Sequence, residues 1–373
     1  MAFENRLIGY VVLALLVALV ISFLATPVVK TFAYKVGAID VPKDGRRMHK
    51  VPIPRLGGLA IFIGFMVSIL LFVQITSEMK SILLGAVIIV VLGVVDDIMA
   101  LPAMLKFIVQ IIAAMIPATH GVVIQVLSNP NVFSKDAYWT LGWLSIPVTV
   151  LWIVAITNAV NLIDGLDGLA NGVSAISAST VLIIAILGSE MQVAIVMAAV
   201  VGACVGFLPY NLNPAKMFMG DTGATFLGYI LATMSIQGLF KFYAIISFAV
   251  PFLILGLPIF DTAFAFIRRI AHGQSPMKAD RGHIHHRLID MGLSQKQAVA
   301  TLYVISTILG LSAVVLATGG EEKAMLFFLA LCVVAIVAAR VIFPKEIREE
   351  LHEEIEELKE HGHHEDEKKD EES

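Results

Sequence analysis

The chain has little charge and almost no cysteine. Charged residues make up 15% of its 373 residues, and the two cysteines, Cys204 and Cys332, both lie in apolar runs. Neither a disulfide framework nor a thiolate metal site is supported, and a soluble domain would carry roughly 25% charge. Apolar residues instead reach 58%, with a mean hydropathy of +0.86. This composition indicates a polytopic membrane protein.

A transmembrane helix needs about 20 apolar residues. On that rule we predict an all-α polytopic membrane fold with eleven spans, at residues 7–29, 56–75, 82–95, 104–120, 146–163, 169–187, 191–208, 222–237, 243–266, 299–317 and 324–343. The third span is short, so we expect it to tilt or to lie in thinned bilayer. No small-residue cleavage site follows the first span, which we expect to be retained.

Lysine and arginine indicate the orientation, because they concentrate in cytoplasmic loops. If the N-terminus lies outside and the C-terminus in the cytoplasm, only five of the 26 basic residues face outward. These are Arg6, Lys80, Lys135, Lys241 and Lys323. The other 21 then face the cytoplasm, which favours this orientation.

Two further segments lie outside the predicted spans. The outer loop 121–145 contains a β-prone run and an Asn-Pro-Asn turn, which predict a short hairpin. We treat residues 1–344 as the transmembrane domain and 345–373 as an acidic cytoplasmic tail. Apolar residues at helical spacing predict a short helix at the start of this tail, and its polar end is predicted to be disordered.

Five polar clusters fall in loops that this topology places on the cytoplasmic side. They contain, in order, Lys50 and Arg55; Asp96 and Asp97 with Lys106 nearby; Asn161, Asp164 and Asp167; Asn211, Phe218, Gly220 and Asp221; and Arg281, His283, His285, His286 and Arg287. Unpaired carboxylates are expensive in hydrocarbon, so the acids at these membrane boundaries must face water, a cation or a substrate.

The residue types favour phosphate and magnesium chemistry. Carboxylates from several loops are the hard ligands that Mg²⁺ selects, with phosphate oxygens and water completing its shell. Asp221 follows a glycine at a predicted helix start, where it could act as an N-cap or help to form a phosphate site. Phe218 could stack on a base or simply pack at the interface.

The histidine cluster admits two interpretations. Together with Arg281 and Arg287, the three histidines could clamp a negatively charged group, whereas the plain alternative is the positive charge of any cytoplasmic loop. Lys50 and Arg55 admit the same two interpretations, and Asp261 is expected to pair with one of these arginines. The clusters together predict a Mg²⁺-dependent site for a phosphorylated, water-soluble substrate, with a membrane-embedded co-substrate on its lipid side.

Four motifs then carry a resemblance to a known family. They are the Asp-Asp after the third span, Asn-Ala-Val-Asn-Leu-Ile-Asp-Gly-Leu-Asp-Gly, Phe-Met-Gly-Asp-Thr-Gly and Ala-Asp-Arg-Gly-His-Ile-His-His-Arg. Over about residues 1–320 the chain resembles the polyprenyl-phosphate N-acetylhexosamine-1-phosphate transferases. The His-Ile-His-His run is similar to the WecA/TagO branch, which uses N-acetylglucosamine.

The resemblance implies transfer of N-acetylglucosamine-1-phosphate from UDP-N-acetylglucosamine to undecaprenyl phosphate, with release of UMP. It implies Mg²⁺ as cofactor, with Mn²⁺ as a substitute. The implied metal ligands are Asp221 and Asp97, and the implied catalytic residues are Asp96, Asp97, Asp164, Asp167, His285 and His286. The implied substrate-binding residues are Lys50, Arg55, Asn161, Asn211, Phe218, Gly220, Arg281, His283 and Arg287.

The product would be the lipid-linked precursor of a cell-envelope polymer such as lipopolysaccharide or teichoic acid. We expect no nucleic-acid partner, and a homodimer is left open. Two alternatives remain: the same reaction with another UDP-N-acetylhexosamine, and a divalent-cation or phosphosugar transporter. Transporters place polar groups near the bilayer midplane, often in repeated halves, whereas the acids here collect at helix ends and no repeat is evident.

Overall fold

The structure is a computed structural model that describes residues 2–42, 51–128, 138–240, 249–271, 283–319, 322–323, 325–329 and 332–333. Its longer helices are α1 (Ala2–Val36), α2 (Gly57–Phe72), α3 (Ser77–Met99), α4 (Ala103–Thr119), α5 (Ser145–Leu162), α6 (Leu169–Leu187), α7 (Met191–Asn211), α8 (Gly220–Ser235), α10 (Gly256–Ala271) and α12 (Gln295–Gly319). The shorter elements are strands β1 (Ile39–Asp40) and β2 (Ile53–Pro54), β3 (Val126–Ser128) and β4 (Tyr138–Thr140), helices α9 (Ala249–Ile254) and α11 (Ile284–Asp290), and single turns at Gly142–Leu144 and Ile236–Phe240.

Six described segments are long and apolar enough to cross a membrane: Ile8–Val36, Ser77–Met99, Gly142–Leu162, Leu169–Leu187, Met191–Asn211 and Gln295–Gly319. The helices α2 and α4 are apolar but shorter. The prediction of a mainly helical, multi-pass membrane protein is therefore confirmed. The predicted span 324–343 and the tail 345–373 lie largely outside the described residues.

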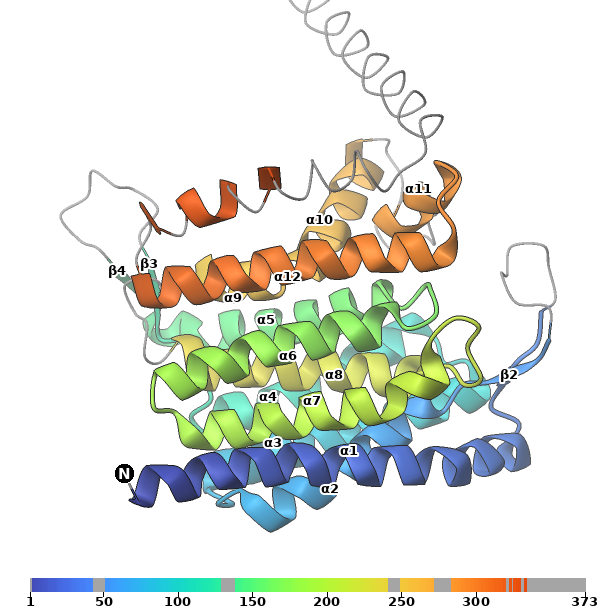
Figure 1. Cartoon of the computed structure of the whole chain (residues 1–373), viewed down its shortest axis with the longest axis horizontal. Helices are drawn as coiled ribbons and strands as arrows, with labels where there is room; N and C mark the ends of the chain where they lie inside the picture. The colour runs from blue at the N-terminus through green and yellow to red at the C-terminus, as the bar shows by residue number, and fades with distance from the viewer. Residues whose placement is uncertain are drawn as a thin grey trace, which may run out of the picture.

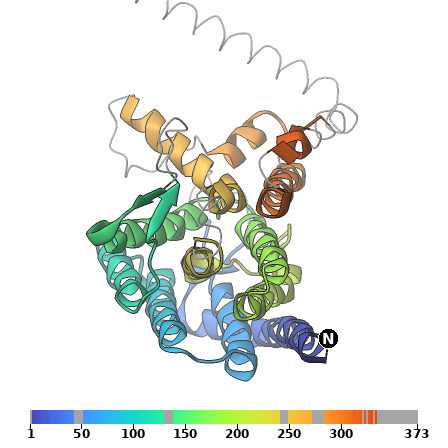
Figure 2. The same cartoon turned by 90° about the vertical axis from the view of Figure 1, so that its left-hand side faces the viewer.

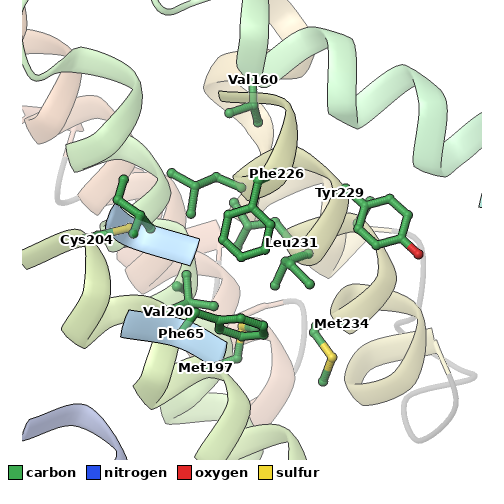
Figure 3. Packing of buried hydrophobic residues seen from close by; sticks show 14 of the residues in the cluster. Phe65, Val160, Met197, Val200, Cys204, Phe226, Tyr229, Leu231 and Met234 are labelled. Atoms are coloured by element: carbon green, nitrogen blue, oxygen red, sulfur yellow. The ribbon is translucent and has the colours of Figure 1, made fainter. Parts of the chain in front are cut away.

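Helix α8 lies in the centre of the bundle, with α2 to α7 around it (Figure 2). Every residue of α8 from Thr222 to Ser235 is buried, as expected for a helix that is apolar on all sides. Its Phe226 ring lies 5.3 Å from the ring of Phe65 on α2, and Met197 of α7 and Tyr229 of α8 belong to the same core (Figure 3). This packing fixes the position of the N-terminus of α8.

Helix α3 is longer than the short third span that we predicted. It starts at Ser77, where the Thr76 side chain accepts a hydrogen bond from the Met79 amide at 3.2 Å, and it runs for 23 residues. The predicted shortness of this span was therefore wrong, while its tilt stays a prediction. Polar Glu78 and Lys80 lie within the first turn and hid the start of the helix from a count of apolar residues.

The predicted ninth span is interrupted between α9 and α10 at Leu255. Pro258 has no amide hydrogen to donate to the Ile254 carbonyl four residues earlier, which weakens a continuous helix there. The Ser177 hydroxyl of α6 donates to that carbonyl instead, at 2.8 Å. A side chain from a neighbouring helix thus satisfies the carbonyl that the proline leaves open.

The predicted hairpin is confirmed as an antiparallel pairing of β3 with β4, in which Leu127 lies opposite Trp139. This pair lies at the left-hand end of the bundle in Figure 1. The connections α3–α4, α5–α6 and α7–α8, together with strand β2 and helix α11, lie at the right-hand end (Figure 1). The polar clusters with described residues therefore share one end of the bundle.

Candidate functional site

Asp97, in the last turn of α3, holds the start of α8. Its Oδ1 accepts hydrogen bonds from the Asp221 amide at 3.1 Å and from Arg55 Nε at 3.1 Å. Its Oδ2 accepts from the amide and the hydroxyl of Thr222, at 3.0 and 2.7 Å. The residue is 5% exposed. Asp97 thus acts as an N-cap supplied by another helix, and it neutralises the positive end of α8.

Asp221 faces a second acid across a shared lysine. Lys106 Nζ lies 2.9 Å from Asp96 Oδ2 and 3.0 Å from Asp221 Oδ2. The Asn161 side chain also lies near the Asp221 carboxylate, and Arg55 Nη2 lies 4.0 Å from Asp221 Oδ1. Sequence reasoning grouped Lys106 with the aspartates but assigned it no role. Lys106 bridges the two carboxylates, and its place as a single cation in the first turn of an apolar helix was the signal that could have indicated this role.

The N-termini of α2 and α8 meet beside these charges. The amides of Gly57 and Gly58 donate to the carbonyls of Phe218 and Met219 at 2.9 and 2.8 Å. Gly220 has a φ of +72°, and a side chain there would collide with the Arg55 carbonyl and with Asp97. The start of α8 is already neutralised by Asp97, and the first amides of α2 donate to carbonyls, so the positive charge left to attract an anion such as phosphate is that of Arg55 and Lys106.

Asp164 lies in the loop between α5 and α6, near the same charges. Burial raises its pKa from 3.8 to about 8, and the negative charges of Asp221 and Asp97 raise it further, against the opposing effect of Arg55. These four side chains come from connections far apart in the chain. The expectation that acids from separate loops gather at one end of the bundle is therefore confirmed, and the raised pKa of Asp164 favours its protonated form in the metal-free protein.

Asp167 and Asn211 bind the α7–α8 loop. Asp167 Oδ2 accepts hydrogen bonds from Asn213 Nδ2 at 2.9 Å and from the Ala215 amide at 3.0 Å. Asn211 is buried and donates to the Met217 carbonyl at 3.1 Å. In this structure both residues shape the loop that leads to α8. Catalytic and substrate-binding roles for them stay predictions.

The histidines lie on α11 and at its start. His283 Nδ1 lies 2.9 Å from Asp261 Oδ2, and the Ile284 amide donates to Asp261 Oδ1 at 2.7 Å. Asp261 thus pairs with a histidine, and the expected arginine partner stays a prediction, because Arg281 lies outside the described residues. The buried pair leaves His283 little freedom to reach a substrate.

His285 packs against the loop between α5 and α6, residues 163–168, which carries Asp164 and Asp167 and is called the acid loop below. The His285 ring occupies the space beside Gly165 in this loop. It is 2% exposed. Burial lowers its pKa to about 4, and the neighbouring charge of His286 adds to this effect. This lowered pKa favours neutral His285 at pH 7, so it would contact an anion through a hydrogen bond rather than a full charge. His286 and Arg287 are partly exposed.

Not every predicted site residue is described. Lys50 and Arg281 lie outside the described residues, so their roles stay predictions. Phe218 is partly buried; its amide donates to the Pro54 carbonyl at 2.8 Å, and base stacking by its ring stays a prediction.

The side chains present fit a magnesium ion that shares its shell with substrate. The described residues contain no ready-made group of three or more acidic, histidine or cysteine donors, but Mg²⁺ commonly takes only one or two carboxylates and completes its shell with phosphate oxygens and water. Asp221, with 23% of its side chain exposed, can supply such a carboxylate. Asp97 already accepts four hydrogen bonds through both oxygens and is better suited to hold α8.

Known proteins resemble the chain along most of its length. Residues 79–239 match the model of glycosyl transferase family 4. Over 314 residues the chain is 43% identical to the probable undecaprenyl-phosphate N-acetylglucosaminyl 1-phosphate transferase of Bacillus subtilis (strain 168), which covers 84% of this chain and 86% of that protein.

More distant relatives carry similar names. The chain is 32% identical over 317 residues to the decaprenyl-phosphate N-acetylglucosaminephosphotransferase of Mycolicibacterium smegmatis, covering 78% of each protein. It is 32% identical over 268 residues to the undecaprenyl-phosphate alpha-N-acetylglucosaminyl 1-phosphate transferase of Thermotoga maritima, covering 72% of this chain and 78% of that protein.

Proposed function

The chain belongs to glycosyl transferase family 4, and from that premise we propose that it transfers N-acetylglucosamine-1-phosphate from UDP-N-acetylglucosamine to undecaprenyl phosphate. UMP is the second product, and the lipid-linked sugar feeds a cell-envelope polymer. The observation that carries the proposal is the gathering of Arg55, Lys106, Asp164 and Asp221 around the joined starts of α2 and α8. The names of the relatives supply the donor and the acceptor.

The reaction exchanges one phosphoanhydride for another. An oxygen of the lipid phosphate attacks the phosphorus that carries the sugar, and the bond from that phosphorus to the oxygen of UMP breaks. No ATP is needed. Catalysis of phosphoryl transfer is mainly positioning and neutralisation of charge. Arg55 and Lys106 supply fixed positive charge, while Asn161 and Lys106 orient the carboxylate of Asp221.

A general base has little to do in this reaction. A phosphate monoester has a second pKa of about 6, so the lipid phosphate is already largely dianionic at pH 7. Asp97, the base that the family resemblance suggests, is buried and bonded to four donors. Direct attack by the lipid phosphate agrees with both facts and needs no covalent aspartyl intermediate.

Magnesium, with manganese as a substitute, completes the proposed site. Asp221 would hold the ion, and Asp164 or Asp96 lies near enough in the charge cluster to assist. When bound, the ion neutralises charge on the pyrophosphate of the donor. Asp221→Asn should then lower turnover by roughly 10³-fold or more, the scale of loss on removing a principal electrostatic group.

The proposed topology has eleven spans, the N-terminus outside and the site facing the cytoplasm from the bacterial inner membrane. The excess of basic residues in the odd-numbered loops supports this orientation. The placement of the described polar clusters at one end of the bundle supports a single active face. A homodimer stays a prediction.

A purified assay tests the function. Enzyme in detergent would receive undecaprenyl phosphate, Mg²⁺ and labelled UDP-N-acetylglucosamine, and release of UMP would be measured together with transfer of label into organic solvent. Asp221→Asn should be inactive, and Asp290→Asn, which changes an exposed acid at the same end of the bundle, should be active. Absence of UMP release with this donor would refute the proposal.

The same purified enzyme also tests two alternative functions, a different sugar donor and a transporter. A panel of UDP-N-acetylhexosamines identifies the donor, because enzymes of one fold can differ in the sugar that they use. A transporter is not supported, since the relatives are named as transferases. Uptake of labelled UDP-sugar into sealed vesicles without release of UMP would reverse that conclusion.

A further inference from the structure

Helix α12 contacts the acid loop through one tyrosine. Tyr303 Oη donates a hydrogen bond of 2.6 Å to the carbonyl of Gly168. Its ring lies against Gly172, where an added Cβ would fall on the ring atoms. Gly168 immediately precedes α6 and ends the loop that carries Asp164 and Asp167. A residue far outside the predicted motifs therefore fixes the end of that loop.

Two further contacts join the same parts of the molecule. Asn213 Nδ2 donates to Gln295 Oε1 at the start of α12 at 2.6 Å, and to Asp167 Oδ2 at 2.9 Å. The His285 ring of α11 lies against Gly165 in the acid loop. Helices α11 and α12 are separated by only four residues. The histidines and the acids are thus held together at three points.

The hydroxyl of Tyr303 is not needed to complete α6. The Gly168 carbonyl also accepts the Gly172 amide at 2.9 Å, the first backbone bond of that helix. The tyrosine bond is therefore additional and runs between separate helices. Loss of the tyrosine bond should cost little stability, because the Gly168 carbonyl keeps its backbone partner. The bond therefore acts mainly on the position of α12 relative to the acid loop.

We propose that Tyr303 is a positioning residue of the sugar-1-phosphate transfer, setting the acid loop of Asp164 at its working distance from the histidines of α11. This inference rests on the proposed function. The acid loop carries Asp164 of the proposed site and packs against His285 of α11, and a displacement of about 1 Å in such a site can lower the rate by as much as 10²-fold. Loss of the hydroxyl should slow turnover more than it weakens donor binding.

The test compares two variants that each remove one hydroxyl from α12. Tyr303→Phe keeps the ring against Gly172 and loses only the bond to Gly168. It should lower kcat roughly tenfold, with the KM for UDP-N-acetylglucosamine within about twofold of wild type. Thr307→Val is the matched control, because its exposed hydroxyl bonds only to the Tyr303 carbonyl within the same helix. It should leave kcat and KM unchanged.

A second variant distinguishes an effect on the position of Tyr303 from an effect on the stability of the fold. Gly172→Ala retains the hydroxyl but pushes the ring of Tyr303 away, and alanine favours the helix by about 1 kcal/mol relative to glycine. It should lower kcat at least as far as Tyr303→Phe, with no fall in Tm large enough to explain the loss. A kcat for Tyr303→Phe within twofold of wild type would overturn the inference while the function stands. An inactive wild-type enzyme would refute the function itself.

Discussion

Replacing Asp164 by asparagine should stabilise the metal-free protein and abolish its activity. Burial and the charges of Asp221 and Asp97 hold the pKa of Asp164 at about 8, whereas its ordinary value is 3.8. Between about pH 4 and pH 8, the folded protein thus keeps a proton that the unfolded chain has already released. Asparagine resembles the protonated acid in shape and carries no charge to release.

The sign and size follow from proton linkage. Because the unfolded state binds fewer protons in this pH window, the stability of the wild type falls by about 1.4 kcal/mol per pH unit as pH rises from 4 to 8. The full shift corresponds to about 6 kcal/mol. Asp164 is partly exposed, so solvent screening reduces this contribution to about 3 kcal/mol. The difference is fully developed above about pH 8 and absent below about pH 4.

The measurement is a thermal unfolding scan in detergent with EDTA, at several pH values between 5 and 8.5. For a chain of this size, about 3 kcal/mol corresponds to an increase in Tm of a few degrees. The Tm of Asp164→Asn should therefore exceed that of wild type increasingly as pH rises, while its release of UMP is lost. A variant that is less stable at pH 8, or a difference that does not change with pH, would refute the reasoning.

Three further predictions concern the charges and the topology. Lys106→Met should lower kcat by about 10²-fold or more in the UMP assay, because it removes the cation between two carboxylates; Lys80→Met, at the other end of α3, should stay near wild type. Asp97→Asn should lower both Tm and turnover, with a loss of about 2 to 4 kcal/mol, because the bonds that start α8 are charge-assisted; an unchanged Tm would contradict its role as a cap. In a background without reactive cysteine, a cysteine at Lys216 should react with an impermeant maleimide only in inside-out vesicles, and one at Gln125 only in intact cells; the reverse result would invert the topology.

The sequence predicted elements where one local signal dominated. Helix α6 begins and ends where its apolar run does, at Leu169 and Leu187. The hairpin of β3 with β4 followed from a β-prone run and turn residues, although the Asn-Pro-Asn turn itself lies outside the described residues. Local signals failed where polar residues continue a helix, as at the start of α3, and where Pro258 interrupts an apolar run. A count of apolar residues contains neither kind of information.

The sequence predicted which residues form the candidate site better than it predicted what each of them does. Clusters at helix ends indicated which loops would meet. The four hydrogen bonds of Asp97, the bridge formed by Lys106 and the burial of His285 depend on how α3, α4, α8 and α11 pack together. Packing of this kind joins residues more than 100 positions apart, and spacing along the chain cannot reveal it.

The junction of α2 with α8 has a mechanical consequence. Three main-chain hydrogen bonds tie Pro54, Gly57 and Gly58 to Phe218 and Met219. The separation of Arg55 from Asp221 is therefore set by peptide groups on both sides of the junction, rather than by interlocking side chains. Changes in lipid or detergent that loosen the hydrophobic interior should therefore leave the backbone around Arg55 and Asp221 in place.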